Sequence, residues 1–251
     1  MDYQIRRVGD QVTQSGTTNT DNQYRLPLTD EVKSFSDLAI TDANRSAIST
    51  IRKLQAWQSL AICLIGPPRC GLGVIGKLWA KEADARLVSA SALDKMSLQD
   101  ASELATKNLV LDLADAIDSD ERFLTVLNLS RANGVHVLLT ARSAPALWTC
   151  QSADLKSRID AIPVAEIYPP DEDMLRLRLS ASCKRRFIRL NKSTVDFLAI
   201  RLPRSYMAIE DYVARLDAAI EATGRAPSLH LAREVLSEGA SSHKLFDDSL
   251  E

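Results

Sequence analysis

The chain has 251 residues, of which 45% are hydrophobic and 25% are charged, the composition of an ordinary soluble globular protein. Its 31 basic and 33 acidic side chains leave a net charge of −2, so no overall positive field attracts it to nucleic acid. The sequence contains neither the ~20 consecutive apolar residues of a membrane span nor the apolar core of a secretion signal. Four scattered cysteines, Cys63, Cys70, Cys150 and Cys183, show no metal-ligand spacing and indicate a reducing, cytoplasmic compartment.

Residues 1–30 are rich in Gln, Thr, Asn, Asp and Ser, and we expect disorder there because they bury too little apolar area to offset the entropy of ordering. One hexapeptide interrupts this tail, Gln23-Tyr24-Arg25-Leu26-Pro27-Leu28. From residue 31 the composition becomes that of a folded core. A helix capped by Thr41 or Asp42 is then predicted to end at about Trp57.

Short apolar runs then alternate with helical patterns up to residue 168. Strands are expected at 60–65, 86–90, 108–112, 135–140 and 162–167. Helices are expected at 72–83, 97–106, 119–132 and 152–160. Strands separated by helices predict βαβ units, and therefore a mostly parallel sheet with helices on both faces. Residues 31–168 are accordingly assigned to one α/β domain.

The pattern changes after Tyr168-Pro169-Pro170, where two prolines predict a hinge. Helical periodicity without intervening strands indicates a small all-helical domain at residues 169–238. Its helices are expected at 171–186, 192–201, 205–221 and 228–237. The polar residues 239–251 are expected to form a flexible tail.

The segment Gly66-Pro67-Pro68-Arg69-Cys70-Gly71-Leu72-Gly73 follows the first strand and begins the next helix. It keeps both glycines of the phosphate-binding pattern G-x-x-x-x-G-K-[ST]. Leu72 replaces the lysine that reaches the β- and γ-phosphates, and Gly73 replaces the hydroxyl that holds Mg²⁺. Backbone N–H groups at the helix N-terminus can still receive an anion, but the cation and metal ligand of phosphoryl transfer are missing. Lys77 is a poor replacement, since it lies about a turn and a half into the helix.

Three other segments carry recognisable patterns. Leu109-Val110-Leu111-Asp112 ends a strand in a carboxylate, Asp154-Leu155-Lys156-Ser157-Arg158-Ile159 fits D-L-x-S-R-[LI], and Phe35-Ser36-Asp37-Leu38 precedes Asn44-Arg45. With the loop and the hexapeptide, they resemble AAA+ proteins of the DnaA branch, and within it the Hda-type regulatory inactivators of DnaA. The resemblance covers about residues 23–237. It implies an AAA+ module, in which a parallel P-loop sheet sandwiched by helices is followed by a small helical lid domain.

The hexapeptide resembles the Q-x-x-L-P-L peptide by which Hda-type proteins bind the replicative sliding clamp, the β subunit of DNA polymerase. A proline-stiffened, unstructured segment suits this role, because it presents a Gln amide for hydrogen bonds and apolar side chains for pockets. The resemblance assigns clamp binding to Gln23, Tyr24, Leu26, Pro27 and Leu28. The alternative is a fortuitous linker sequence.

The resemblance also implies positions around a bound nucleotide. Asn44 would contact the base, Asp112 would order a metal ion, Thr140 would face the γ-phosphate, and Arg204 would replace a sensor arginine that aligns with Met207. The nucleotide-binding candidates are therefore Gly66, Gly71, Leu72, Gly73, Asn44, Asp112, Thr140 and Arg204. The simpler alternatives are that Phe35 belongs to the core, that Asn44 is a surface residue and that Asp112 only caps its strand.

Two losses weaken this nucleotide site. The missing lysine removes a charge-assisted contact, so binding of ADP or ATP is expected to weaken by on the order of tenfold to a hundredfold. Leu113 stands where the family has a second acidic residue that polarises the attacking water. We therefore expect no metal site, no certain cofactor and no autonomous ATPase activity.

Arg158 matches the arginine finger of the family, which projects into the nucleotide site of a neighbouring subunit. A guanidinium placed against transferring phosphate oxygens can raise turnover by ~10³–10⁵ and needs no nucleotide in its own subunit. The alternative is one more surface arginine on an amphipathic helix. A separate basic stretch, Arg176, Arg178, Lys184, Arg185, Arg186 and Arg189, is either a solvated face or a docking surface for an acidic partner or a DNA backbone.

The leading interpretation is a negative regulator of replication initiation that docks on the sliding clamp and stimulates ATP hydrolysis by DnaA through Arg158. One alternative is a clamp- or DnaA-binding paralogue that acts by competition, and another is a weak AAA+ ATPase. The expected partners are DnaA, the clamp and further copies of the chain through the AAA+ faces. No membrane contact is expected, and DNA contact is at most indirect.

Overall fold

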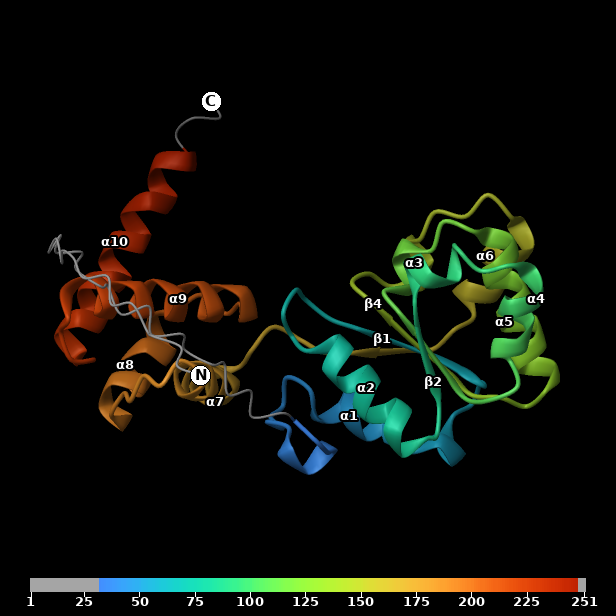
Figure 1. Cartoon of the computed structure of the whole chain (residues 1–251), viewed down its shortest axis with the longest axis horizontal. Coiled ribbons are helices and arrows are strands. Elements are labelled where there is room, and N and C mark those ends of the chain that lie inside the picture. The colour runs from blue at the N-terminus through green and yellow to red at the C-terminus, as the bar shows by residue number, and fades with distance from the viewer. Residues whose placement is uncertain (1–31, 248–251) are drawn as a thin grey trace, which may run out of the picture.

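The computed structural model describes residues 32–247, which form a parallel sheet flanked by helices and followed by a helical unit (Figure 1). The sheet has five parallel strands in the order β2-β3-β4-β1-β5. The strands are β1 (Ala61–Ile65), β2 (Arg86–Ser89), β3 (Leu109–Asp112), β4 (Val137–Ala141) and β5 (Val164–Glu166). Each predicted strand is present, with ends shifted by at most two residues, so the α/β prediction is confirmed.

The helices before and between the strands follow the predicted order. They are α1 (Arg45–Arg52), α2 (Leu72–Glu82), α3 (Ala90–Leu93), α4 (Leu98–Leu104), α5 (Asp120–Ala132) and α6 (Ala153–Asp160). The first differs from its prediction, because α1 ends at Arg52 and a 3₁₀ turn, Leu54–Ala56, replaces its last turn. The sequence also gave no sign of α3, a single turn that Ser89 caps by accepting a hydrogen bond from the Ala92 N–H.

Alternate residues of each strand enter different cores, because successive side chains of a strand point to opposite faces of a sheet. Cys63 of β1 packs on one face against α5 and α6. Its neighbour Leu64 packs on the other face against α1 and α2, where Trp79 is 1% exposed. Figure 1 shows the two helix layers on opposite sides of the sheet. Both faces of the sheet are therefore covered, as expected for apolar parallel strands.

The chain after β5 is helical. Its elements are α7 (Glu172–Arg185), α8 (Lys192–Arg201), α9 (Tyr206–Thr223) and α10 (Leu229–Asp247). They enclose a separate core in which Leu179, Leu198 and Leu216 are fully buried. We refer to α7–α10 as the lid. The helix α10 continues past its predicted end at residue 237, so the part of the predicted tail up to Asp247 is helical, and no proline interrupts it.

The lid is joined to the sheet unit by hydrogen bonds as well as by the chain. Asp171 caps α7 by accepting from the Met174 N–H at 2.7 Å, and it also accepts from the Ala43 N–H at 2.9 Å. The Tyr206 hydroxyl donates to the Tyr168 carbonyl at 3.3 Å. These contacts hold the first turns of α7 and α9 against the edge of the sheet at which the Gly66–Gly73 loop begins. Within the described residues, no helix combines the length and the apolar composition needed to cross a bilayer.

Candidate functional site

The loop between β1 and α2 has two residues with positive φ and leads directly into the N-terminus of α2. Gly71 caps α2 with φ of 109°, a conformation that glycine adopts without strain. Arg69 also has a positive φ, 66°, which costs a non-glycine residue roughly 1–2 kcal/mol. The Cys70 N–H donates to the Pro67 carbonyl at 3.2 Å and closes a turn that contains Arg69.

The interior of this loop is filled by its own cysteine. An ideal Cβ on Gly66 would lie 2.8 Å from the Cys70 sulfur and 3.0 Å from the Ile167 Cβ. Burial raises the pKa of the Cys70 thiol, and the Leu72 N–H and the Arg178 guanidinium oppose that rise. The thiol therefore lies beside a backbone N–H of the kind that such loops offer to a phosphate.

Gly66→Ala is expected to lower the free energy of unfolding by about 1–3 kcal/mol, because its methyl group would overlap Cys70 and Ile167. Gly73→Ala is the matched control, since its nearest neighbour would be the Asp112 Oδ2 at 3.8 Å. Alanine in a helix is about 1 kcal/mol more favourable than glycine, so this change is expected to be neutral or stabilising. Urea titration followed by circular dichroism measures both, and equal effects would contradict the close packing inferred at Gly66.

The two residues that replace the loop's lysine and hydroxyl have different surroundings. Leu72 is 9% exposed and packs in the core between the sheet, α1 and α2. Its side chain is therefore part of that core. An ideal Cβ on Gly73 would lie 3.8 Å from the Asp112 Oδ2, in ordinary van der Waals contact, so this is where a hydroxyl side chain and the strand-end carboxylate would meet.

Asp112 and Thr140 are brought together at the ends of β3 and β4. The Thr140 hydroxyl donates to the Asp112 carboxylate at 2.6 Å and accepts from the Leu113 N–H at 3.1 Å. Thr140 is 0% exposed, and Leu113 has φ of 57°. The pair thus ties two neighbouring strands together directly beside the loop.

Asn44 and Phe35 stabilise the segment of the chain that precedes β1. The Asn44 side chain donates to the Ala39 carbonyl at 2.9 Å and accepts from the Thr41 N–H at 3.0 Å. Asn44 is 8% exposed, so it is not a surface residue. Phe35 is 4% exposed and lies in the core, under the Arg52 guanidinium at 4.8 Å.

A cavity of about 820 Å³ is lined by residues of the loop, α2 and the lid, and we call it the lid pocket. Asn44, Cys70 and Gly71 line it, whereas Arg204 does not. Its cationic lining comes from three parts of the chain and comprises Lys33, Arg69, Lys77, Lys81, Arg178, Arg185 and Arg186. The only carboxylate that lines it in the described part of the chain is Glu210. All three lid arginines of this pocket belong to the basic stretch seen in the sequence, but the sequence did not place them in a pocket.

The lid arginines are held in place by specific partners. Arg178 donates to the Arg69 carbonyl of the loop at 2.8 Å, and its guanidinium lies 5.5 Å from the centre of the Tyr206 ring. Arg185 donates to Glu210 at 2.8 Å. Burial would raise the pKa of Glu210, but the hydrogen bond from Ser182 and the charge and hydrogen bond of Arg185 outweigh it and lower that pKa below its ordinary value. Arg178 therefore closes the lid directly onto the loop.

These residues suit an anion better than a magnesium nucleotide. The lid pocket has an excess of cations, and the loop keeps its helix N-terminus. Gly73 supplies no oxygen, Asp112 already accepts from Thr140, and no cluster of three metal-ligating side chains occurs among the described residues. If ADP or ATP binds, Lys77, Arg178 and the N–H groups at the start of α2 are the residues that would hold its phosphates.

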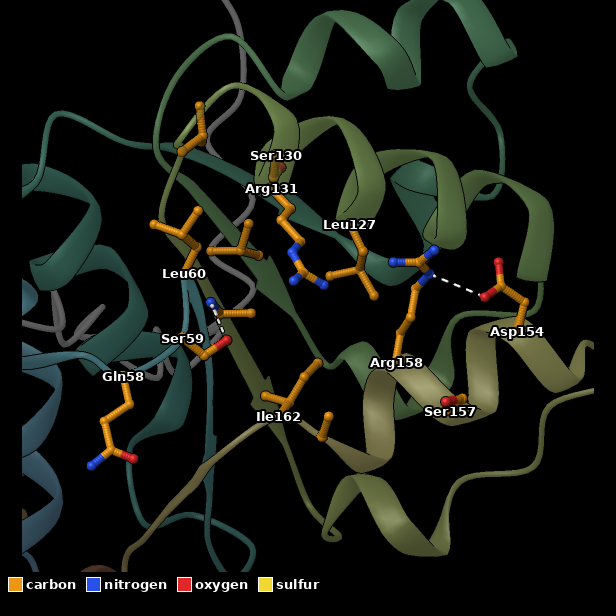
Figure 2. A pocket seen from close by; sticks show the side chains of 14 residues that line it. Gln58, Ser59, Leu60, Leu127, Ser130, Arg131, Asp154, Ser157, Arg158 and Ile162 are labelled. Atoms are coloured by element: carbon orange, nitrogen blue, oxygen red, sulfur yellow. Dashed lines mark hydrogen bonds and ion pairs between the residues drawn. The ribbon is translucent and has the colours of Figure 1, made fainter.

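Arg158 lies in a second cavity, at the opposite edge of the sheet. It occupies the last turn of α6, where a cation interacts favourably with the helix dipole. Its Nε lies 3.3 Å from the Asp154 carboxylate, and its side chain is 36% exposed. The cavity measures about 680 Å³ and is shown in Figure 2; we call it the edge cavity. Its lining includes Leu60 and Ala61 at the start of β1.

The predicted clamp-binding residues, Gln23, Tyr24, Leu26, Pro27 and Leu28, lie outside the described residues. Their role therefore remains a prediction from the sequence.

The strand order, the loop after β1 and the helical lid define an AAA+ module. Domain III of the replication initiation protein DnaA from Thermotoga maritima has the same fold, with a TM-score of 0.66 and 16% identity over 82% of this chain and 96% of that one. AMPPCP-bound DnaA from Aquifex aeolicus matches with a TM-score of 0.61 and 16% identity, over 77% and 68% of the two chains. The fold is therefore that of a DnaA-like AAA+ module.

Sequence comparison agrees with this fold. The chromosomal replication initiator protein DnaA of Campylobacter jejuni is 25% identical over 118 residues, which cover 47% of this chain and 27% of that protein. The chain thus spans about a quarter of the length of the curated relative it matches. No protein-family model matches the chain. The predicted DnaA-like AAA+ fold is confirmed, and the Hda-type assignment stays a prediction from the sequence.

Proposed function

We propose that this protein is a negative regulator of replication initiation that acts on DnaA. It pairs with ATP-bound DnaA and places Arg158 against the nucleotide of DnaA, where the guanidinium stabilises charge on the transferring phosphate. The sliding clamp, bound by Gln23–Leu28, brings the two proteins together. The observation that carries this proposal is the position of Arg158, which lies far from the loop of its own chain.

The distance between Arg158 and the loop of its own chain follows from the length of β1. The edge cavity around Arg158 includes Ala61 at the start of this strand, whereas Gly66 follows its last residue, Ile65. Five residues at ~3.3 Å each place roughly 16 Å of strand between the two edges. A guanidinium at the far edge cannot contact a phosphate in its own loop, but it can contact one that a neighbouring subunit presents.

The sequence of the Gly66–Gly73 loop also supports a role in which DnaA hydrolyses the nucleotide and this chain supplies an arginine. Leu72 is a core residue and Gly73 carries no hydroxyl, so the chain lacks the groups that hold a magnesium nucleotide for hydrolysis. Arg158 does not depend on those groups. We therefore assign hydrolysis to the intact site of DnaA and only the arginine to this chain.

ATP turnover by DnaA, measured with clamp and DNA in the presence and absence of the chain, tests the proposal. Stimulation is the expected result. Clamp binding without stimulation would overturn it and favour competition instead. One contact favours that second function: Asp154 holds Arg158 from within its own helix, so the arginine must leave a carboxylate before it can act on a phosphate.

Gln23→Ala is expected to weaken capture of the chain by immobilised clamp about tenfold, because the amide hydrogen bonds of the peptide are lost. Gln14→Ala in the same N-terminal segment is the matched control and should bind as the wild type. Equal capture of all three proteins would contradict clamp docking through this peptide, without bearing on Arg158.

A further inference from the structure

The edge cavity contains a second arginine. Arg131 lies in the last turn of α5 and Arg158 in the last turn of α6, and both line the cavity. Figure 2 shows the two side chains extending into the cavity from different helices, with Leu127 between them. Two like charges that share one cavity repel each other unless an anion neutralises them.

The charge of the cavity is not balanced by its own residues. Within the described part of the chain, Asp154 is the one carboxylate in its lining. Asp154 contacts Arg158 and is itself 59% exposed. Arg131 is exposed and has no ion pair or side-chain hydrogen bond within residues 32–247. One positive charge is thus left over in the cavity.

Two polar atoms at the cavity also lack hydrogen-bond partners among the described residues. Ser130 is 2% exposed, and its hydroxyl makes no hydrogen bond to any other residue in 32–247. The Arg158 Nε is buried as an atom and has no hydrogen bond of acceptable geometry in the same part of the chain, although Asp154 lies 3.3 Å away. An unpaired buried polar group destabilises the fold, so its presence in a cavity points to a partner that the described residues do not supply.

We propose that the edge cavity is a two-arginine phosphate pocket. Arg131 acts beside Arg158, and the two guanidiniums bind the terminal phosphates of a nucleotide that a neighbouring AAA+ subunit holds. Planar guanidinium forks match the spacing of phosphate oxygens, and the Ser130 hydroxyl adds a neutral donor. This inference rests on the proposed function of Arg158 and adds Arg131 and Ser130 to that site.

Titration of the full chain with inorganic tripolyphosphate at low ionic strength tests the pocket without DnaA. Arg131→Ala and Arg158→Ala are each expected to weaken the calorimetric affinity roughly ten- to a hundredfold, the loss of one charge-assisted contact. Ser130→Ala is expected to weaken it about two- to tenfold without lowering the melting temperature. Arg189→Ala, an exposed lid arginine that lines a different cavity, should bind as the wild type.

Arg178→Ala reports on the lid pocket, the other basic cavity. If tripolyphosphate binding is lost with Arg178→Ala and unchanged with Arg131→Ala, the anion binds at the lid pocket and our inference is overturned. The same holds if no variant changes the affinity.

Stimulation of DnaA separates the inference from the proposed function on which it rests. Arg131→Ala should lower stimulated turnover about tenfold to a hundredfold, and Arg131→Lys should restore part of it. Loss of stimulation with Arg158→Ala alone would overturn the role of Arg131 and leave the proposed function standing. Unchanged stimulation in both variants, with tripolyphosphate binding lost, would instead support the pocket and refute the proposed function.

Discussion

If the chain stimulates ATP turnover by DnaA as proposed, Arg158→Ala is expected to lower the stimulated turnover by about a thousandfold or to the unstimulated rate, whichever is reached first. The physical reason is that alanine removes a cation that stabilises charge developing on the phosphate oxygens of the partner's nucleotide. Arg158→Lys keeps the charge but loses the planar fork, so we expect only a small part of the stimulation to remain. Phosphate release under multiple-turnover conditions, with clamp and DNA present, measures all three proteins.

The control lies on the same helix. Lys156 pairs with Asp160 at 2.7 Å and does not line the edge cavity, so Lys156→Ala tests for a general effect of removing a cation from α6. It should stimulate DnaA as the wild type does. Asp154→Asn removes the carboxylate that holds Arg158 and should leave stimulation equal or higher. Full stimulation by the Arg158→Ala variant would contradict the role of Arg158 as an arginine finger. Loss of stimulation in the Lys156→Ala variant would show that removing any cation from α6 has this effect.

Local patterns in the sequence were sufficient to predict the sheet and the position of the loop. Leu60–Ile65 could be recognised because a buried parallel strand is apolar on both faces. Gly66 and Gly71 could be recognised because their roles follow from backbone geometry at fixed spacing. Arg158 could be singled out as a candidate because its neighbours in the chain form a recognisable pattern.

The residues that surround these positions could not be predicted in the same way. Arg131 is separated from Arg158 by a strand and several turns, and only the packing of α5 beside α6 brings both to one cavity. Arg178 reaches the loop carbonyl of Arg69 across 109 positions of sequence. Such contacts depend on how helices pack in three dimensions, which neither periodicity nor motif spacing contains.

Two residues that were expected to contact a nucleotide make hydrogen bonds to protein groups in the structure. Thr140 was expected to face a phosphate, and its hydroxyl donates to Asp112. Asn44 was expected at a base, and its amide closes the backbone turn before α1. Buried polar groups form hydrogen bonds with the nearest available partner. A residue that occupies a nucleotide-binding position of a motif can therefore bond to protein groups when no nucleotide is bound.

The double variant Leu72→Lys, Gly73→Thr is expected to strengthen ATP binding by about tenfold to a hundredfold and to make it depend on magnesium. The lysine would supply the lost charge-assisted contact, worth roughly 1.5–3 kcal/mol. A threonine hydroxyl has room at position 73, where the nearest atom to an ideal Cβ is the Asp112 Oδ2 at 3.8 Å. Calorimetric titration with ATP, with and without Mg²⁺, measures the change.

Hydrolysis should not return with binding, because Leu113 cannot polarise a water molecule. Leu72→Met with Gly73→Ala is the matched control, since it changes the same positions, keeps position 72 apolar and adds no donor; its ATP affinity should equal that of the wild type. If the lysine variant keeps its melting temperature and still binds ATP like the wild type, the missing side chains do not weaken ATP binding in the way that the sequence predicts. The closed loop itself would then be the obstacle, with the Cys70 sulfur against Gly66 and the lid held to the Arg69 carbonyl by Arg178.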